Sequence, residues 1–287
     1  MAETNDIRDL AYLSESDIQK LNFVNASGSY FFRKYYRSGL RSHIFEVLAK
    51  NDVLKETRGE VIDGVRMFPR ARPKKMFRIL RKRFENKEKI FHEIERYHIL
   101  LNFLGKDLIA ESEEFIVDYT GTGESQILLC GLQEYIQGEI LDPWRFFGDN
   151  YLKELFKSGT HRESKLLDLI QKARKNIAKF VKRIRSMIKE TGYIPDLAGI
   201  GNLVLTPEGG LKLVDINNIV EIKFNDTIFI DDKGYPSCDV SVEVLSMLER
   251  NIFQNDLFMD DPLYRLFLSK KRKIKVKALE KEFYKNL

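Results

Sequence analysis

Three polar residues with the chemistry of a phosphate and metal site lie close together in this sequence. Asp196 and Asn202 precede a short apolar segment, Leu203–Leu205, and Asp215 follows a second one, Leu211–Val214, after a turn that contains Pro and Gly. Two such segments predict a hairpin, which brings the residues just outside it together. Asn and Asp supply the oxygen ligands that Mg²⁺ takes when it also holds substrate phosphates. Asp196 could receive a proton from a substrate hydroxyl.

This segment resembles the catalytic and metal-binding loops of the protein-kinase-like fold, written there as H-R-D-x-x-x-x-N followed by D-F-G. The resemblance implies that Asp196 is the catalytic Asp and that Asn202 and Asp215 bind Mg²⁺. The sequence departs from the family pattern at Ile194, Pro195, Ile216 and Asn217. An ordinary hairpin with polar ends is the alternative interpretation.

The loop between Asp196 and Asn202 is one residue longer than in the family, with five residues between them instead of four. We expect Gly199 and Gly201 to absorb the extra residue through unusual backbone angles. The bulge should point outward, so that Asp196 still reaches an acceptor hydroxyl.

Upstream segments follow the order of a kinase N-lobe. Strand-like stretches occur at Phe31–Arg37, His43–Leu48 and Val53–Thr57, with a turn-like break at 38–42. By resemblance, Gly39 and Ser42 lie in the loop over the ATP phosphates, and Lys55 on the third strand neutralises those phosphates. A surface lysine on an edge strand is the alternative for Lys55.

A helix is predicted over about 85–104, where Glu93, Tyr97, Leu100 and Leu104 share one face. The resemblance implies that Glu93 forms an ion pair with the third-strand Lys55, with Glu95 as the second choice. A solvated carboxylate on an amphipathic helix is the alternative.

Two further strands are predicted at Glu114–Tyr119 and Gln126–Gln133, joined by Thr-Gly-Thr-Gly-Glu at 120–124. The E-Y-x-x-G run that follows is similar to a kinase hinge. That similarity implies that backbone groups of Glu134 and Ile136 bind adenine, beside Gln133.

The downstream half is predicted to be mainly helical, with a long helix over about Ser164–Thr191 that leads into the Asp196 loop. A later helix begins near Ser237, and the resemblance implies that Asp239 braces the backbone of the catalytic loop. Ser237 or Asp239 could equally be a plain N-cap. The segment between Asp215 and this helix is short and has no A-P-E motif, so the resemblance is to compact atypical kinases with a reduced C-lobe.

Composition fits a globular protein. The chain has 287 residues, 43% of them hydrophobic and 32% charged, with a net charge of +5 and two cysteines that lack metal or disulfide spacing. We expect a reducing compartment, the cytoplasm, and no signal peptide or transmembrane segment.

The positive charge is concentrated between Arg66 and Lys89, where eleven Lys or Arg stand against two Glu. This basic segment is a candidate surface for an acidic or phosphate-bearing partner, or for association with a membrane surface. The alternative is a solvated helix face with its apolar residues turned to the core.

The sequence thus predicts an α+β, two-lobed protein-kinase-like fold with ATP and Mg²⁺ between the lobes. Its parts are an N-terminal extension (1–30), an N-lobe (31–133), a hinge (134–140), a mainly helical C-lobe (141–270) and a basic tail (271–287). The expected activity is transfer of the ATP γ-phosphate to a hydroxyl of a small-molecule, sugar or lipid-linked glycan acceptor. The alternatives are a pseudokinase that binds nucleotide or regulates a partner, and a basic nucleic-acid or membrane-surface binding protein without nucleotide.

Overall fold

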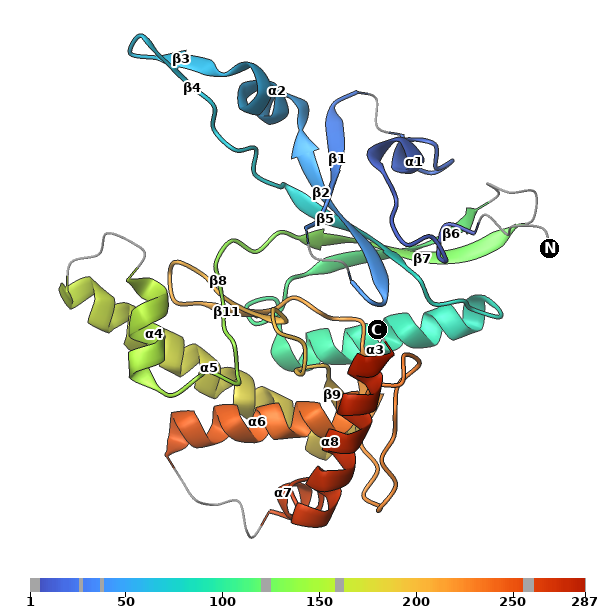
Figure 1. The fold of residues 1–287 in the computed structure, drawn as a ribbon, viewed down its shortest axis with the longest axis vertical. Coiled ribbons are helices and arrows are strands. Elements are labelled where there is room, and N and C mark those ends of the chain that lie inside the picture. Colours follow the sequence, from blue (N-terminus) through green and yellow to red (C-terminus); the bar gives the residue numbers. More distant parts are fainter. Residues whose placement is uncertain are drawn as a thin grey trace. The chain divides into compact units, whose positions relative to one another are not determined.

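The computed structural model describes residues 6–25, 28–36, 39–119, 125–157, 163–254 and 261–286. Helices and strands are mixed along the chain (Figure 1). The chain divides into two compact units: unit 1 comprises Met1–Ile94 and Glu111–Tyr135, and unit 2 comprises Glu95–Ala110 and Ile136–Leu287. Across the described ranges, every helix is too short or too polar to cross a bilayer.

Unit 1 is built on a five-stranded antiparallel sheet. Its strands are β1 (Tyr30–Lys34), β2 (Ser42–Ala49), β5 (Lys75–Leu80), β6 (Ser112–Tyr119) and β7 (Gln126–Glu134), in the order β1-β2-β5-β7-β6. The four predicted strands outside 53–57 are therefore confirmed within one or two residues in their described parts. Arg37, Ser38 and the 120–124 connection lie outside the described residues.

The two faces of this sheet differ in polarity because successive residues of a strand point to opposite sides. Phe45, Phe77 and Cys130 belong to a buried apolar cluster on one face. On the other face, Leu80 and Leu129 pack against Ile90 of helix α3 (Lys87–Leu104). The described part of α3 agrees with the helix predicted over 85–104.

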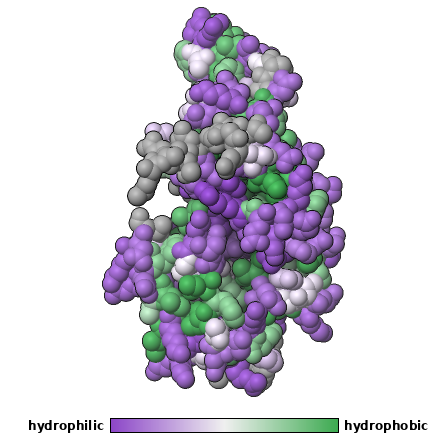
Figure 2. Space-filling view, turned by 90° about the vertical axis from the view of Figure 1, so that its right-hand side faces the viewer, coloured by the Kyte–Doolittle hydropathy of each residue, from purple (hydrophilic) through white to green (hydrophobic). Residues whose placement is uncertain are grey.

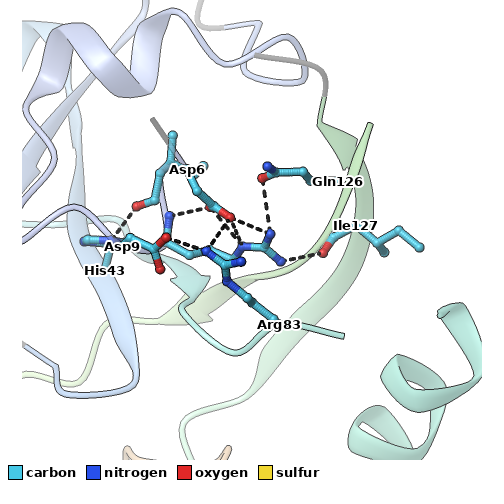
Figure 3. A network of polar contacts seen from close by, with 8 residues as sticks. Asp6, Asp9, His43, Arg83, Gln126 and Ile127 are labelled. Carbon is cyan, nitrogen blue, oxygen red and sulfur yellow. Dashed lines mark hydrogen bonds and ion pairs between the residues drawn. The ribbon is translucent and has the colours of Figure 1, made fainter. Parts of the chain in front are cut away.

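The chain before β1 packs onto the apolar face of the sheet. Leu13 and Ile18 of this segment join the cluster, and the short helix α1 (Glu15–Gln19) begins with a capping box at Ser14. Figure 3 shows the polar contacts that hold its first residues: Asp6 accepts hydrogen bonds from Arg8, and the Nε2 of His43 lies 2.9 Å from the carbonyl of Ile7. The described residues before β1 are thus an integral layer of unit 1.

The predicted third strand at Val53–Thr57 is wrong. Residues Lys50–Arg58 form helix α2, which has Asp52 in its first turn and Lys55 and Arg58 in its last, as the helix dipole favours. Gly59, at a φ of 74°, ends the helix. The hairpin of β3 (Glu60–Ile62) and β4 (Val65–Met67) follows, and the third strand along the sheet is β5.

The basic segment Arg66–Lys89 is not a helix face. Met76, Phe77, Ile79 and Leu80 are buried on strand β5, which lies in the middle of the sheet. Many of its cations have partners inside unit 1, namely Arg66, Lys74, Arg78, Arg81, Lys82, Arg83 and Lys87. The segment therefore offers much less free positive charge than its sequence indicates.

Unit 2 is mainly helical. Its helices are the C-terminal part of α3, α4 (Asp149–Phe156), α5 (Glu163–Thr191), α6 (Ser237–Phe253), α7 (Pro262–Phe267) and α8 (Lys270–Lys285). Its strands are β8 (Glu139–Ile140), β9 (Tyr193–Pro195), β10 (Leu203–Leu205), β11 (Leu211–Leu213) and β12 (Ile219–Glu221). Helices α5 and α6 pack together (Figure 1), and their apolar faces form the centre of one large core with Phe180 and Leu245 fully buried. The predicted helix Ser164–Thr191 and the predicted hairpin are confirmed as α5 and β10–β11.

Candidate functional site

Two short strand pairs in unit 2 hold the loops that carry the predicted catalytic residues. The first loop, 196–202, connects β9 to β10, and the second loop, 214–218, connects β11 to β12. Because β9 pairs with β12 and β10 with β11, both ends of the first loop are fixed beside both ends of the second. The Asp196 N–H extends the β9–β12 pairing by donating to the Asn218 carbonyl at 2.8 Å. The two loops therefore lie side by side.

The carboxylate of Asp196 is buried and held on both sides. Asp196 is only 5% exposed. Its Oδ1 accepts a hydrogen bond from the Ala198 N–H at 2.9 Å, and its Oδ2 accepts one from the Nδ2 of Asn218 at 2.7 Å. Hydrogen bonds to a charged acceptor are stronger than neutral ones, so these two fix the orientation of the side chain.

Asn202 is fixed at the other end of the first loop. Its Nδ2 donates to the Asp196 carbonyl at 2.9 Å, and its N–H donates to the Gly199 carbonyl at 3.1 Å. Its own carbonyl accepts the Val214 N–H at 2.8 Å. With the amide nitrogen used in this way, the amide oxygen is the atom that remains for a ligand.

Unusual backbone angles were predicted at both glycines of the first loop, and the structure confirms them at Gly201 but not at Gly199. Gly201 has a φ of 104°, which side chains rarely allow. Gly199 is needed for space, because a Cβ there would lie 2.6 Å from the Oδ1 of Asn202. Ile200 between them is 64% exposed, so the tip of the loop points to solvent.

The second loop brings Asp215 beside this arrangement. Asp215 is partly exposed, and its Oδ1 lies 3.5 Å from the Asn217 N–H. The Nδ2 of Asn217 is buried and has no hydrogen-bond partner in the described part of the chain. An unsatisfied buried donor is rare and needs an explanation.

The amide and carboxylate oxygens of Asn202 and Asp215 suit a hard cation such as Mg²⁺. The described residues contain no group of three or more His, Cys, Asp and Glu that could hold a metal, so the donors do not form a closed all-protein cage. Mg²⁺ is usually held by one or two protein oxygens, with water and phosphate oxygens completing its shell. The amide oxygen of Asn202 and the carboxylate of Asp215 fit that pattern, and the phosphates would have to come from a bound substrate.

The brace of the first loop comes from Ser241 and not from Asp239, which corrects the prediction. The Oγ of Ser241, which is fully buried in α6, accepts a hydrogen bond from the Leu197 N–H at 3.0 Å. Asp239 instead pairs with Arg272 of α8, whose Nη2 lies 3.1 Å from its Oδ2. Burial raises the pKa of Asp239, and the neighbouring guanidinium only partly offsets this.

The predicted ion pair between Lys55 and Glu93 is also wrong. Lys55 lies on helix α2, and its Nζ is 2.6 Å from the carboxylate of Glu60. Glu93 of α3 is nearly buried and pairs with Lys82 at 2.7 Å. Lys55 therefore does not occupy the strand position that was expected to bring it near phosphate.

The structure supplies a different cation in the third strand of the sheet. Arg78 of β5 is buried, and its Nη2 donates to the carboxylate of Glu114 at 2.5 Å and to the Oγ of Ser112 at 3.0 Å. Gly131 of β7 makes room for this pair, because a Cβ there would lie 2.6 Å from the Glu114 Oε1 and 2.8 Å from the Arg78 Nη2. An arginine among the apolar residues that follow Lys75 in β5, M-F-R-I-L, was the signal for this residue.

The remaining predicted nucleotide contacts lie at the ends of strands. Gly39 stands in the tight turn before β2, where a Cβ would be 2.7 Å from the Ser42 carbonyl, and Ser42 is the first residue of β2. Glu134 ends β7, with its N–H bonded to the Glu111 carbonyl at 2.8 Å. Ile136 lies in the irregular stretch 135–138 before β8 and is the residue at which the chain returns to unit 2.

No model of a known protein family matches this chain, and a search of curated proteins finds no match to it.

Proposed function

We propose that this chain is an atypical ATP-dependent phosphotransferase of the protein-kinase-like class, with two lobes and a reduced C-lobe. The observation that carries the proposal is the pair of side-by-side loops in unit 2. They bring Asp196 and Asn202 of one loop next to Asp215 of the other, through the β10–β11 hairpin and the pairing of β9 with β12. Phosphoryl transfer depends on positioning and charge stabilisation more than on covalent chemistry, and such rigid loops serve positioning.

Each residue has a distinct role in this proposal. When bound, Mg²⁺-ATP supplies the transferable γ-phosphoryl group. Asn202 and Asp215 hold the ion through their side-chain oxygens. Asp196, oriented by Asn218, takes the proton of the acceptor hydroxyl. Ser241 of α6 fixes the first loop by accepting a hydrogen bond from the Leu197 N–H.

The acceptor in this proposal is a small molecule, a sugar or a lipid-linked glycan. Between β12 and α6, residues 222–236 contain no helix. Large acceptors such as folded proteins need an extended docking platform, and this short segment gives no room for one. That favours a compact acceptor hydroxyl.

A second candidate, a pseudokinase that binds nucleotide without transferring phosphate, is favoured by one observation. Asp196 is only 5% exposed, and both of its carboxylate oxygens already accept hydrogen bonds. A general base must come within hydrogen-bond reach of the proton that it removes. In this candidate, Asp196 serves only to hold the loop.

Binding of Mg²⁺-ATP is the first test, because both candidates require it. At a ligand concentration a hundred times its Kd, the free energy of unfolding should rise by about 2.7 kcal/mol. Asp215→Asn should remove the Mg²⁺-dependent part of this gain, and Asp168→Asn, at an exposed position on α5, should not. A wild-type protein whose unfolding is unaffected by millimolar ATP and Mg²⁺ would refute both candidates.

Asp196→Ala separates the two candidates. If the chain is a phosphotransferase, this substitution lowers phosphoryl transfer or ATP hydrolysis by at least the roughly 10²-fold of a lost general base, with ATP binding retained. If the wild-type protein binds ATP but Asp196→Ala leaves a trace activity unchanged, the pseudokinase holds.

A further inference from the structure

Helix α8 turns one face to the core of unit 2 and exposes lysines and an aromatic ring on another side. Its buried residues are Arg272, Val276 and Phe283. Exposed residues spaced alternately four and three positions apart share one side of the helix: Lys270, Ile274, Lys277, Lys281 and Tyr284. We call these five residues the α8 row.

The positive charge of α8 is only partly balanced inside unit 2. The helix carries eight Lys or Arg against two Glu. Arg272 and Lys273 form ion pairs with acids of α6, whereas no lysine of the α8 row takes part in an ion pair within the described residues. Lys277 and Lys281 are four residues apart, and like charges at that spacing repel each other. A bound polyanion would remove this repulsion.

The aromatic ring at the end of the α8 row is exposed but held in place. Tyr284 is 64% exposed. Its ring lies edge-on to the rings of Tyr235 and Phe283, with centroids 6.3 Å and 5.3 Å away. The Tyr235 hydroxyl in turn donates to Glu280 of α8 at 2.8 Å. Because its neighbours already fix the Tyr284 ring, a flat ligand that stacks on it costs little conformational entropy.

Lysines alone do not distinguish α8 from the rest of the surface. Figure 2 shows hydrophilic side chains (purple) over much of the face that it presents. On α5, exposed cations are already engaged, since Lys179 forms an ion pair with Asp107 and Arg183 donates to the Phe103 carbonyl at 3.2 Å. The α8 row differs because its lysines have no ion-pair partner among the described residues and stand beside an exposed, oriented ring.

We propose that the α8 row is a binding surface for single-stranded nucleic acid. Its lysines hold the phosphates and a base stacks on Tyr284, the combination by which proteins bind single strands without reading their sequence. From Lys270 to Tyr284 the row is about 21 Å long, which is enough for several nucleotides. A bilayer fits less well, because the apolar side chains of α8 are buried in unit 2 and cannot enter a membrane interface. The inference goes beyond the proposed phosphotransferase activity and does not rest on it.

Fluorescence anisotropy of a labelled oligothymidylate, titrated with the full chain, tests the role of the ring. Tyr284→Ala should weaken binding about tenfold without changing its salt dependence, since one stacked base is lost. Tyr284→Phe keeps the ring and should bind like the wild type. Neither substitution should change the binding of a duplex of the same length, because the bases of a duplex are already stacked.

The salt dependence of the same titration tests the lysines. The triple variant Lys270→Gln, Lys277→Gln, Lys281→Gln should reduce the slope of log affinity against log salt concentration by about 2, since each phosphate contact to a single strand contributes about 0.7. Far-UV circular dichroism of this variant should match the wild type, because the substitutions remove repulsion.

Matched controls come from exposed positions of the same unit. One control removes the same charge from α5 and the other removes an exposed ring: Lys165→Gln, Lys175→Gln, Lys189→Gln and, separately, Phe147→Ala. The α5 variant should keep the wild-type salt slope, and the ring variant should keep the wild-type affinity.

Absence of oligonucleotide binding, equal changes of slope in the two triple variants, or an unchanged affinity in Tyr284→Ala would overturn the proposal. Displacement of the oligonucleotide by excess ATP at constant ionic strength would also overturn it, because the strand would then occupy a nucleotide site. Equally tight binding of poly-glutamate or of phosphatidylserine vesicles would assign the α8 row to an acidic protein or a membrane instead.

Discussion

Asn217 and Asn218 are neighbours of the same type in the second loop, and we predict that they contribute to stability with opposite signs. The Nδ2 of Asn218 donates to the Asp196 carboxylate at 2.7 Å, whereas the Nδ2 of Asn217 is buried without a partner among the described residues. Asn218→Ala therefore removes a hydrogen bond, whereas Asn217→Ala removes a buried donor that makes none.

The magnitudes follow from burial and charge. Hydrogen bonds to charged groups contribute about 1.5–3 kcal/mol, and Asp196 is 5% exposed, so Asn218→Ala should cost about 2 kcal/mol. An unsatisfied buried donor costs about 1–3 kcal/mol, so Asn217→Ala should be neutral or stabilising by about 1 kcal/mol after its lost packing. The two variants should differ by about 2–3 kcal/mol.

Equilibrium urea unfolding measures this difference, provided that fluorescence and circular dichroism give coincident transitions. Hydrogen exchange of the first loop is the second measurement, and exchange should rise in Asn218→Ala alone. Equal destabilisation by both substitutions, or a larger loss in Asn217→Ala, would refute the assignment of these contacts.

Three further predictions concern contacts away from the second loop. Burial lowers the pKa of His43 from 6.5 to about 4, so between these values the unfolded state takes up a proton that the folded state does not, and stability falls as pH falls from 6.5 towards 4. Between pH 7 and pH 5 the free energy of unfolding of the wild type should fall by about 2 kcal/mol relative to that of His43→Gln in urea unfolding, and parallel pH profiles would contradict this. Ser241→Ala should cost about 1–3 kcal/mol because it leaves a buried N–H unpaired, and the control Ser246→Ala, which removes a bond within α6, should cost less in the same assay. Arg272→Leu should lower the free energy of unfolding by about 3–5 kcal/mol, because it leaves the Asp239 carboxylate buried and unpaired. The double variant Arg272→Leu, Asp239→Leu should regain part of this stability, and a double variant less stable than the single one would count against the prediction.

Local sequence determined the elements whose signals are complete within a short window. The apolar spacing of α3 and α5 and the Gly-containing turn between β10 and β11 are such signals, because helix and hairpin contacts join residues a few positions apart. The unusual backbone angle at Gly201 was predicted from the same local stretch, whereas the close approach of Gly199 to the Asn202 side chain was not. The kinase-like class itself remains a proposal.

Helix α2 was mispredicted although local signals for it exist. Asp52 in the first turn, basic residues in the last turn and Gly59 after it are all typical of a helix. The two β-branched residues Val53 and Thr57, together with the expected order of a kinase N-lobe, outweighed them in the prediction. Whether a short segment with mixed propensity becomes a helix or a strand depends on the elements that it packs against.

Only the tertiary structure decided which side chains meet. The sequence offered Lys55 and Glu93 as a pair and Asp239 as a brace, but Lys55 binds Glu60 and Asp239 binds Arg272. Lys55 and Glu60 are close in sequence, but they meet only because residues 50–58 form a helix and not the predicted strand. Nothing in a local pattern specifies Arg272 as the partner of Asp239, because helix packing brings these residues together from 33 positions apart. The same reason applies to the bond between Asn218 and Asp196, which exists because β9 and β12 pair in one register.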